Sequence, residues 1–171
     1  MRKSKILNMI NPKFNLVTLL FILGLFSFQA KAQQETGSPK SKPMLYAKGV
    51  KAPATNFTGT VWVNMLVTAQ DQLDSGIGSV TFEPGARTNW HLHPGGQALL
   101  VTEGKGLYQE KGGAVTVIRK GDVIKCPPGI AHWHGASPKK KLTHIAISTN
   151  AEKGPAVWLQ PVTDEEYLHN K

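Results

Sequence analysis

The histidines of this chain are grouped in a pattern that could hold a metal ion. His91 and His93 lie two residues apart, and His132 and His134 repeat this spacing further along the chain. Because side chains alternate between the two faces of a strand, we expect each pair to point to one face. A divalent metal is held by several neutral nitrogen or oxygen donors that converge from different elements. The two pairs therefore predict a metal site.

Two further side chains extend this group. Gln97 follows the turn signal Pro94-Gly95-Gly96, where a strand that doubles back could aim its amide at the point that His91 and His93 face. His144 lies in a third expected strand. A lone histidine is more often a hydrogen-bonded residue of the surface or core, and His144 taken alone could be such a residue of a barrel wall. The repeated pairs favour a metal site in the dry interior of a small β-barrel.

The elements that must position these residues are short strands separated by glycine and proline. Turn signals such as Glu83-Pro84-Gly85 and Pro127-Pro128-Gly129 recur between the strands, and this spacing predicts an antiparallel sandwich or barrel. Only Thr163 to Leu168 is expected to be helical, with Thr163 as its N-cap. The expected strands are 60–67, 77–82, 88–93, 97–102, 106–110, 114–118, 122–126, 132–135 and 142–148.

The chain divides into four segments. Residues 1–32 resemble a secretory signal, with a basic front, an apolar stretch and an Ala30-Lys31-Ala32 exit that predicts cleavage before Gln33. The apolar stretch is short for a membrane span, so a retained anchor is the less favoured alternative. Residues 33–56 are expected to form an extended arm, 57–160 a single β-barrel domain and 161–171 a C-terminal segment. We therefore expect an exported protein, periplasmic or secreted, without a membrane anchor after cleavage.

The net charge of +9, from 20 basic and 11 acidic residues, first invites a nucleic-acid partner. Five of the basic residues and no acidic ones lie in residues 1–32, so the remainder carries only +4. The run from Lys139 to Lys141 is expected to be a solvated loop tip, and no aromatic residues alternate with it as a base-stacking surface requires. The charge distribution therefore predicts no nucleic-acid partner, and the histidine site in a barrel interior predicts a small-molecule ligand instead.

Several residues near the histidines are expected to be structural. Trp90 and Trp133 should face away from the metal because strand neighbours alternate. Arg87 is expected in a loop with its charge solvated. Cys126 is the only cysteine, which excludes a disulfide within the chain, and no neighbour activates it.

The motif residues resemble the cupin superfamily. The stretch from Gly85 to Gly104, which contains His91, His93 and Gln97, is similar to the first cupin motif, and the stretch from Gly121 to His132 is similar to the second. The resemblance implies an all-β, single-domain double-stranded β-helix, or jelly-roll, barrel. It also implies that the metal ligands are His91, His93, Gln97 and His132.

The chain departs from the usual cupin pattern at two positions. Gln97 stands where a glutamate is usual, and Ala136 stands where an asparagine is often found. An amide in place of a carboxylate removes one negative charge, so a bound ion would keep its full dipositive charge and act as a stronger Lewis acid. This favours non-redox chemistry over oxygen activation.

A closer resemblance links the domain to small bacterial manganese-dependent cupins of the hydroxynitrile lyase type and to cupins related to carboxymuconolactone decarboxylases. It is carried by the segments 57–61, 79–88, 112–115, 132–136 and 143–147. The resemblance implies cleavage or formation of cyanohydrins. His134 and His144 are the candidate acid and base, and Thr88 is a candidate hydrogen-bond donor to the substrate. Val80 and Phe82 are expected to line an apolar substrate pocket.

Three functions stay open at this point. The first is a metal-dependent lyase, the second a cupin oxygenase or oxidoreductase, and the third a metal- or small-molecule-binding module without catalysis. One divalent ion is expected; Mn(II) is favoured by the resemblance, while Fe(II), Zn(II), Ni(II) and Cu(II) suit the same donors. A homo-oligomer, dimer or tetramer, is expected because small cupins commonly pair their barrels.

Overall fold

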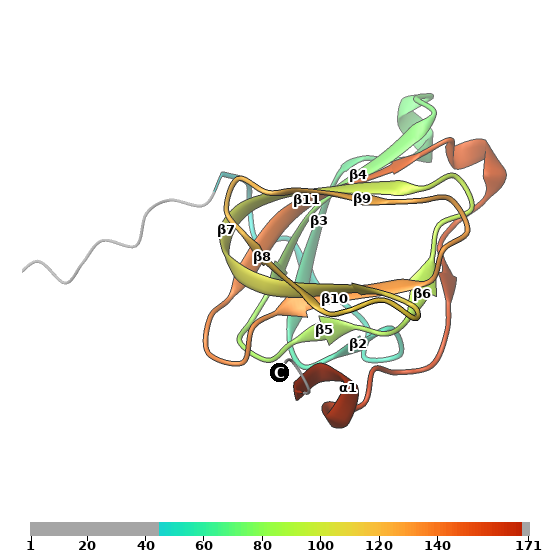
Figure 1. Cartoon of the computed structure of the whole chain (residues 1–171). Coiled ribbons are helices and arrows are strands. Elements are labelled where there is room, and N and C mark those ends of the chain that lie inside the picture. The colour runs from blue at the N-terminus through green and yellow to red at the C-terminus, as the bar shows by residue number, and fades with distance from the viewer. Residues whose placement is uncertain (1–44, 169–171) are drawn as a thin grey trace, which may run out of the picture. The chain divides into compact units, whose positions relative to one another are not determined.

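The structure, a computed structural model, describes residues 45–168. The expected signal segment 1–32, the arm up to residue 44 and residues 169–171 lie outside the described residues. The described part is built almost entirely of strands and forms a curled antiparallel barrel, which confirms the expected cupin-like jelly roll (Figure 1). The strands are β1 Val50–Lys51, β2 Phe57–Thr58, β3 Val61–Val67, β4 Ser75–Phe82, β5 Arg87–Thr88, β6 His91–Leu92, β7 Gln97–Glu110, β8 Thr116–Arg119, β9 Val123–Cys126, β10 His132–Ala136, β11 Leu142–Thr149 and β12 Val157–Trp158; the one α-helix among the described residues is α1, Asp164–Leu168.

The long strand β7 joins the two layers of the barrel. Its first half pairs with β11 and β9, and its second half pairs with β10 and β8. We predicted two strands here, 97–102 and 106–110. Gly104 takes a positive φ of 84°, and the pairing with β11 shifts register between Thr143 and His144, but the strand continues through this irregularity. The bend carries the chain from one layer to the other.

The expected strand 88–93 is divided in the structure. β5 ends at Thr88 and pairs with β10 and β2, whereas β6 starts at His91 and pairs with β10 and β12. Between them, the backbone N–H of Trp90 donates to the Gln160 carbonyl at 3.0 Å. The histidine pair thus lies at the end of a short strand that the C-terminal part of the chain holds in place.

Part of the expected arm joins the barrel. β1, within residues 33–56, pairs antiparallel with β3 through Val50↔Val63 and Lys51↔Trp62. The side chain of Asn89 donates to the Thr55 carbonyl at 2.9 Å. The described end of the arm is therefore part of the sheet.

Apolar side chains pack in two places. Inside the barrel, a core is formed by Val61, Val80, Phe82, Ala86, Leu99, Val101, Tyr108, Ile118, Cys126, Ala136 and Leu142. Outside β10, an outer cluster is formed by Trp90, Leu107, Trp133, Val162 and Tyr167. The helix α1 lies beside β5 and β2 (Figure 1) and supplies Tyr167 to the outer cluster. The two tryptophans thus face away from the barrel interior, as strand alternation predicts.

The expected helix start at Thr163 is confirmed. The Glu166 N–H donates to Thr163 Oγ1 at 3.0 Å, and the Thr163 N–H donates to Glu166 Oε2 at 2.9 Å. These reciprocal bonds are a capping box and satisfy donors that a helix end leaves unpaired. A helix this short depends on that cap and on the packing of Tyr167.

The expectation that Arg87 is solvated is wrong. Its side chain is 6% exposed and donates from Nε and Nη2 to the Val162 carbonyl, at 3.2 and 2.9 Å. Nη2 also lies 2.7 Å from Asp164 Oδ1, and the guanidinium lies 4.6 Å from the Tyr167 ring centroid. Arg87 therefore fastens the C-terminal segment to β5, a long-range role that its local sequence does not reveal.

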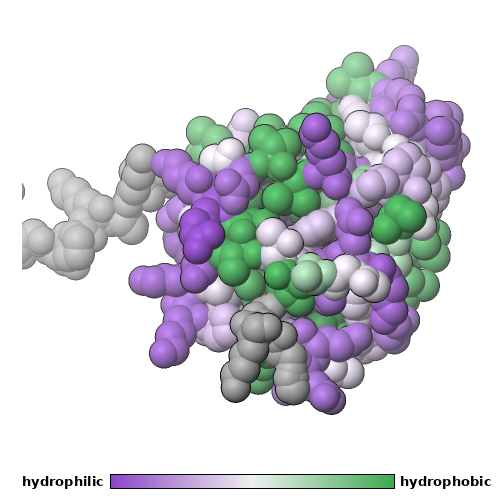
Figure 2. Space-filling view, viewed as in Figure 1, coloured by the Kyte–Doolittle hydropathy of each residue, from purple (hydrophilic) through white to green (hydrophobic). Residues whose placement is uncertain are grey.

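On the face that Figure 2 shows, hydrophobic and hydrophilic residues are mixed. A group of hydrophobic residues lies toward the middle, and others lie at the top and right edges beside hydrophilic ones. The run Lys139 to Lys141 is exposed, and Lys141 Nζ lies 3.3 Å from Glu103 Oε1. Within residues 45–168, no helix has the length and apolar character needed to cross a membrane.

Candidate metal centre

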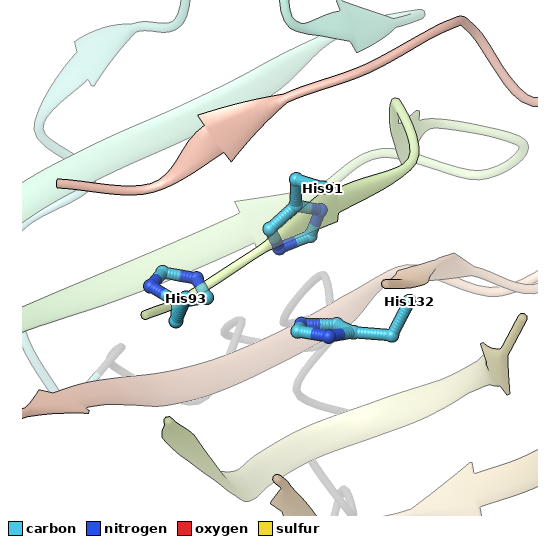
Figure 3. A group of neighbouring side chains, drawn as sticks. All are labelled: His91, His93 and His132. Carbon is cyan, nitrogen blue, oxygen red and sulfur yellow. The ribbon is translucent and has the colours of Figure 1, made fainter. Parts of the chain in front are cut away.

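Three histidines from two neighbouring strands meet inside the barrel. His91 on β6 lies directly opposite His132 on β10, and His93 follows β6 on the same face as His91 (Figure 3). One ring nitrogen from each histidine lies within 4.8 Å of the others. All three side chains are buried. The i, i+2 spacing and the pairing of β6 with β10 bring together three of the four predicted ligands.

The second ring nitrogen of each histidine is held by a neighbouring group. His91 Nδ1 lies 3.0 Å from the Asn89 carbonyl oxygen, and His132 Nδ1 lies 3.0 Å from the Ile130 carbonyl oxygen. A carbonyl only accepts, so each Nδ1 carries the proton and donates, which leaves the lone pair on Nε2. His93 Nδ1 lies 3.3 Å from Ser148 Oγ. Such outer contacts orient the rings of metal-binding histidines.

Gln97 lies at the edge of the same pocket. The His93-Pro94-Gly95-Gly96 turn, in which Gly96 takes a φ of 87° and donates its N–H to the His93 carbonyl, returns the chain into β7. Gln97 Oε1 and His132 Nε2 are buried, and neither has a hydrogen-bond partner in the described part of the chain. Unpaired buried acceptors are costly. An ion held by these atoms would remove that cost, so the donor set fits a divalent metal.

Burial keeps the three histidines neutral. Desolvation lowers the pKa of His93 to about 4, and it lowers the pKa of His91 well below its ordinary value. It also lowers the pKa of His132, although the Ile130 carbonyl and the Glu110 carboxylate act in the opposite direction. Only the neutral imidazole binds a metal, so the pocket holds its ligands in the form that coordination needs.

His134 and His144 form a buried pair next to the three histidines. His144 Nε2 lies 3.2 Å from His134 Nδ1, and the Phe82 ring packs against both, with centroids 5.6 and 5.5 Å away. Burial lowers the pKa of His144 to about 3, and burial together with His144 lowers that of His134 well below its ordinary value. Both imidazoles are therefore neutral and free to accept a proton only from a strongly activated donor.

The other predicted site residues lie around this pair. Thr88 lines the pocket, and its Oγ1 accepts the backbone N–H of His134 at 3.1 Å, so its own hydroxyl hydrogen is not used in that bond. Val80 also lines the pocket. Phe82 is fully buried and packs behind the histidine pair, so it supports the pocket wall instead of forming its surface.

Between these groups lies a cavity of about 190 Å³. One of its lining residues that sequence reasoning missed is Trp158, whose ring stacks on His91 with centroids 4.8 Å apart and lies 5.3 Å from Phe57. Trp158 is opposite His91 in the β6–β12 pairing. A strand of only two residues, such as β12, shows no alternating pattern in the sequence. The contact between Trp158 and His91 could therefore not be predicted from neighbouring residues. The lining also includes Phe57, Val63, Met65, Gly76, Gly78, Ala146 and Ser148.

Cys126 belongs to the hydrophobic core of the barrel. The thiol is buried in the barrel core, and burial raises its pKa to about 11. A thiol with a raised pKa is a poor nucleophile and a poor metal ligand at neutral pH. Its place in the structure is consistent with the structural role expected from the sequence.

Comparison with known proteins agrees with this geometry. The family model described as a cupin domain matches residues 78–148. A curated relative, the (R)-mandelonitrile lyase of Granulicella tundricola, is 50% identical over 117 residues, which span 68% of this chain and 89% of the relative.

Solved structures agree on the fold. A cupin-like protein from Thermotoga maritima is 52% identical, has a TM-score of 0.72, and the match covers 73% of this chain and 95% of that one. A polyketide cyclase from Streptomyces resistomycificus, 18% identical with a TM-score of 0.52 over 63% of this chain and 75% of its own, shares the fold alone.

Proposed function

This chain belongs to the cupin family, and from that premise we propose that it is a metal-dependent lyase that cleaves or forms cyanohydrins. The observation that carries the proposal is the juxtaposition, in one cavity, of a set of metal donors and the neutral His134–His144 pair. The 50% identical mandelonitrile lyase supports the same reaction class.

His91, His93, His132 and Gln97 would hold the metal, which we propose to be Mn(II) on the resemblance noted in the sequence. When bound, a divalent ion would supply Lewis-acid polarisation that lowers the pKa of a substrate hydroxyl. The four donors are uncharged, so they do not weaken that effect. The same donors suit other divalent metals, and elemental analysis of protein purified from its native compartment decides between them.

The remaining residues would move the proton. In cleavage, the cyanohydrin O–H proton passes to one neutral imidazole of the His134–His144 pair, the oxygen forms a carbonyl, and the C–CN bond breaks with its electron pair on cyanide. Cyanide then takes the proton back and leaves as HCN, so the histidine is regenerated. Proton transfer by a positioned side chain contributes about 10²–10⁴-fold in rate. The free hydroxyl hydrogen of Thr88 would orient the substrate oxygen or the nitrile.

The test is an assay of cyanide release from mandelonitrile by the manganese-loaded protein, with oxygen uptake on enediol and phenolic substrates measured in parallel. We expect cyanide release and no oxygen uptake. Oxygen uptake without cyanide release would replace the lyase with an oxygenase. A protein that binds metal and shows neither reaction, and whose ligand affinity survives His134→Ala and His144→Ala, would be a binding module.

We also propose that the protein is exported after cleavage before Gln33 and assembles into a homo-oligomer. The leader composition supports export, and exposed apolar residues on adjacent strands, Leu100 at 36% and Val123 at 57% exposure, support association. N-terminal sequencing of the periplasmic or secreted protein and its mass in solution test the two proposals. An N-terminus that includes residues 1–32, or a monomeric mass, would contradict them.

A further inference from the structure

Two glycines interrupt the inner face of β4. Gly76 and Gly78 alternate with outward-facing residues and share the inner face with Val80, and all three line the cavity. Neither glycine takes a positive φ, so the backbone there would accept any side chain. Glycine inside a strand is unfavourable and often marks a place where a ligand approaches closely. The reason for these glycines therefore lies in the space they leave.

The space above each glycine differs. A Cβ built at Gly76 would meet no heavy atom within 4 Å, whereas a Cβ at Gly78 would lie 3.3 Å from Met65 Sδ. Trp158 lies in the other layer of the barrel, paired with β6, and its ring faces the same cavity. The cavity is thus a slot with bare backbone on one wall and a flat indole on the other.

A polar atom without a partner lies on a residue of the same cavity. His144 lines the cavity, and its Nδ1 is buried with no hydrogen bond within the described chain. A ligand for this cavity therefore has a polar end for the histidines and a flat apolar end for the slot. This assignment of the polar end rests on the proposed function.

We propose that Gly76 and Trp158 determine substrate specificity, and that Gly76 admits a second ring fused to the aryl group of the substrate. Gly76 acts by leaving its position empty, and Trp158 acts by stacking on the ring system. A side chain at position 76 would project into the slot without disturbing the backbone. It would therefore exclude a naphthyl group while still admitting a phenyl group.

The test measures binding of two unreactive alcohols, benzyl alcohol and 2-naphthylmethanol, to the metal-loaded protein by calorimetry. In Gly76→Val we expect the affinity for the naphthyl alcohol to fall about tenfold or more, and that for benzyl alcohol to change by less than about threefold. Gly76→Ala gives a smaller loss in the same direction. Ser75→Val, on the outward side of the same strand, is the matched control and leaves both affinities unchanged, and Trp158→Leu weakens both.

Each result decides the proposal. Metal content equal to the wild type in every variant, with selective loss in Gly76→Val, supports the slot. The proposal is overturned if Gly76→Val loses affinity equally for both alcohols or for neither. It is also overturned if the wild type fails to bind the naphthyl alcohol. Selective binding without cyanide release from mandelonitrile would contradict the lyase proposal but support the role of Gly76. Cyanide release without selectivity at position 76 would support the lyase proposal but contradict the role of Gly76.

Discussion

The two faces of the strands that carry the histidines differ in how their polar atoms are paired. Outward, Trp90 Nε1 donates to Glu166 at 3.2 Å, Trp133 Nε1 donates to Gln109 at 2.8 Å, and the Tyr167 hydroxyl donates to the Ala136 carbonyl at 2.7 Å. Each aromatic group of the outer cluster is both buried and hydrogen-bonded, which is the condition for a stable apolar interface.

On the inward face, three buried polar side-chain atoms of the described chain have no hydrogen-bond partner. His132, next to Trp133, keeps Nε2 buried and unpaired, and Gln97 and His144 each carry another such atom. On the same cavity, a Cβ at Gly76 would meet no heavy atom within 4 Å. The outer face thus pairs its buried polar atoms and favours stability, whereas the inner face leaves buried polar atoms unpaired, as the proposed metal and substrate site requires.

The largest effect expected from this difference is on the inner face. His132→Ala removes one ligand, so we expect metal content to fall below one ion per ten chains and cyanide release to fall about 100-fold or more. In the metal-free protein the variant loses the buried ring and the Nδ1 bond to the Ile130 carbonyl but no bond at Nε2, so we expect the unfolding free energy to fall by about 1–3 kcal/mol. Elemental analysis and denaturant unfolding measure the two. Full metal content in the variant would show that His132 is not a ligand.

A substitution on the outer face should lower the stability of the protein and leave its metal content unchanged. Trp133→Ala removes a fully buried ring and its hydrogen bond to Gln109, and we expect a loss of about 3–5 kcal/mol of unfolding free energy. Metal content of the folded fraction should match the wild type. Denaturant unfolding of the metal-free protein gives the first quantity. If Trp133→Ala lost metal while it kept its stability, the contrast between the faces would be wrong.

A fall in pH should lower the stability of the protein through the buried histidines of the inner face. The folded-state pKa of His144 is about 3, below the ordinary value of 6.5, so the unfolded state binds more protons between these values. Stability is therefore present in full above about pH 6.5 and is lost as the pH falls through this window, by at most about 1.4 kcal/mol per pH unit for this residue. Unfolding of the metal-free protein from pH 7 to pH 4 measures the loss. His144→Gln should flatten the curve, and parallel curves would contradict this origin.

The smallest effect is expected where the outer face meets solvent. Asp164 is 84% exposed, so Asp164→Asn should cost less than about 1 kcal/mol despite the 2.7 Å contact with Arg87. Arg87→Met should cost about 1–3 kcal/mol, because the buried Val162 carbonyl loses both of its guanidinium donors. Unfolding measurements on the two variants compare them. A larger loss for Asp164→Asn would place the stabilisation in the ion pair.

Local spacing was enough to predict that each histidine pair points to one face, whereas the ligand set His91, His93, Gln97 and His132 rested on the resemblance to cupins. His91 and His93 share a face because strands have a period of two, and the glycines after Pro94 predicted the return toward Gln97. The same argument placed Trp90 and Trp133 on the outside. These inferences use only neighbours in sequence, for which backbone geometry dictates direction.

Residues that depend on distant partners could not be predicted in this way. The burial of Arg87 arises from the return of the C-terminal segment, and the position of Trp158 arises from the β6–β12 pairing. The expected break in β7 failed because pairing on both sides carries the strand through Gly104. The cavity beside Gly76 forms only once Trp158 and the second layer of the barrel are in place.

The most direct test of the account is cyanide release from mandelonitrile by one preparation of the protein before metal removal, after chelation and after Mn(II) is restored. We expect release to disappear with the metal and to return in proportion to the ion bound, up to one per chain. Release that persists in the metal-free protein, or a fully reloaded protein that releases no cyanide above the buffer rate, would contradict the proposal that this pocket is a metal-dependent lyase site.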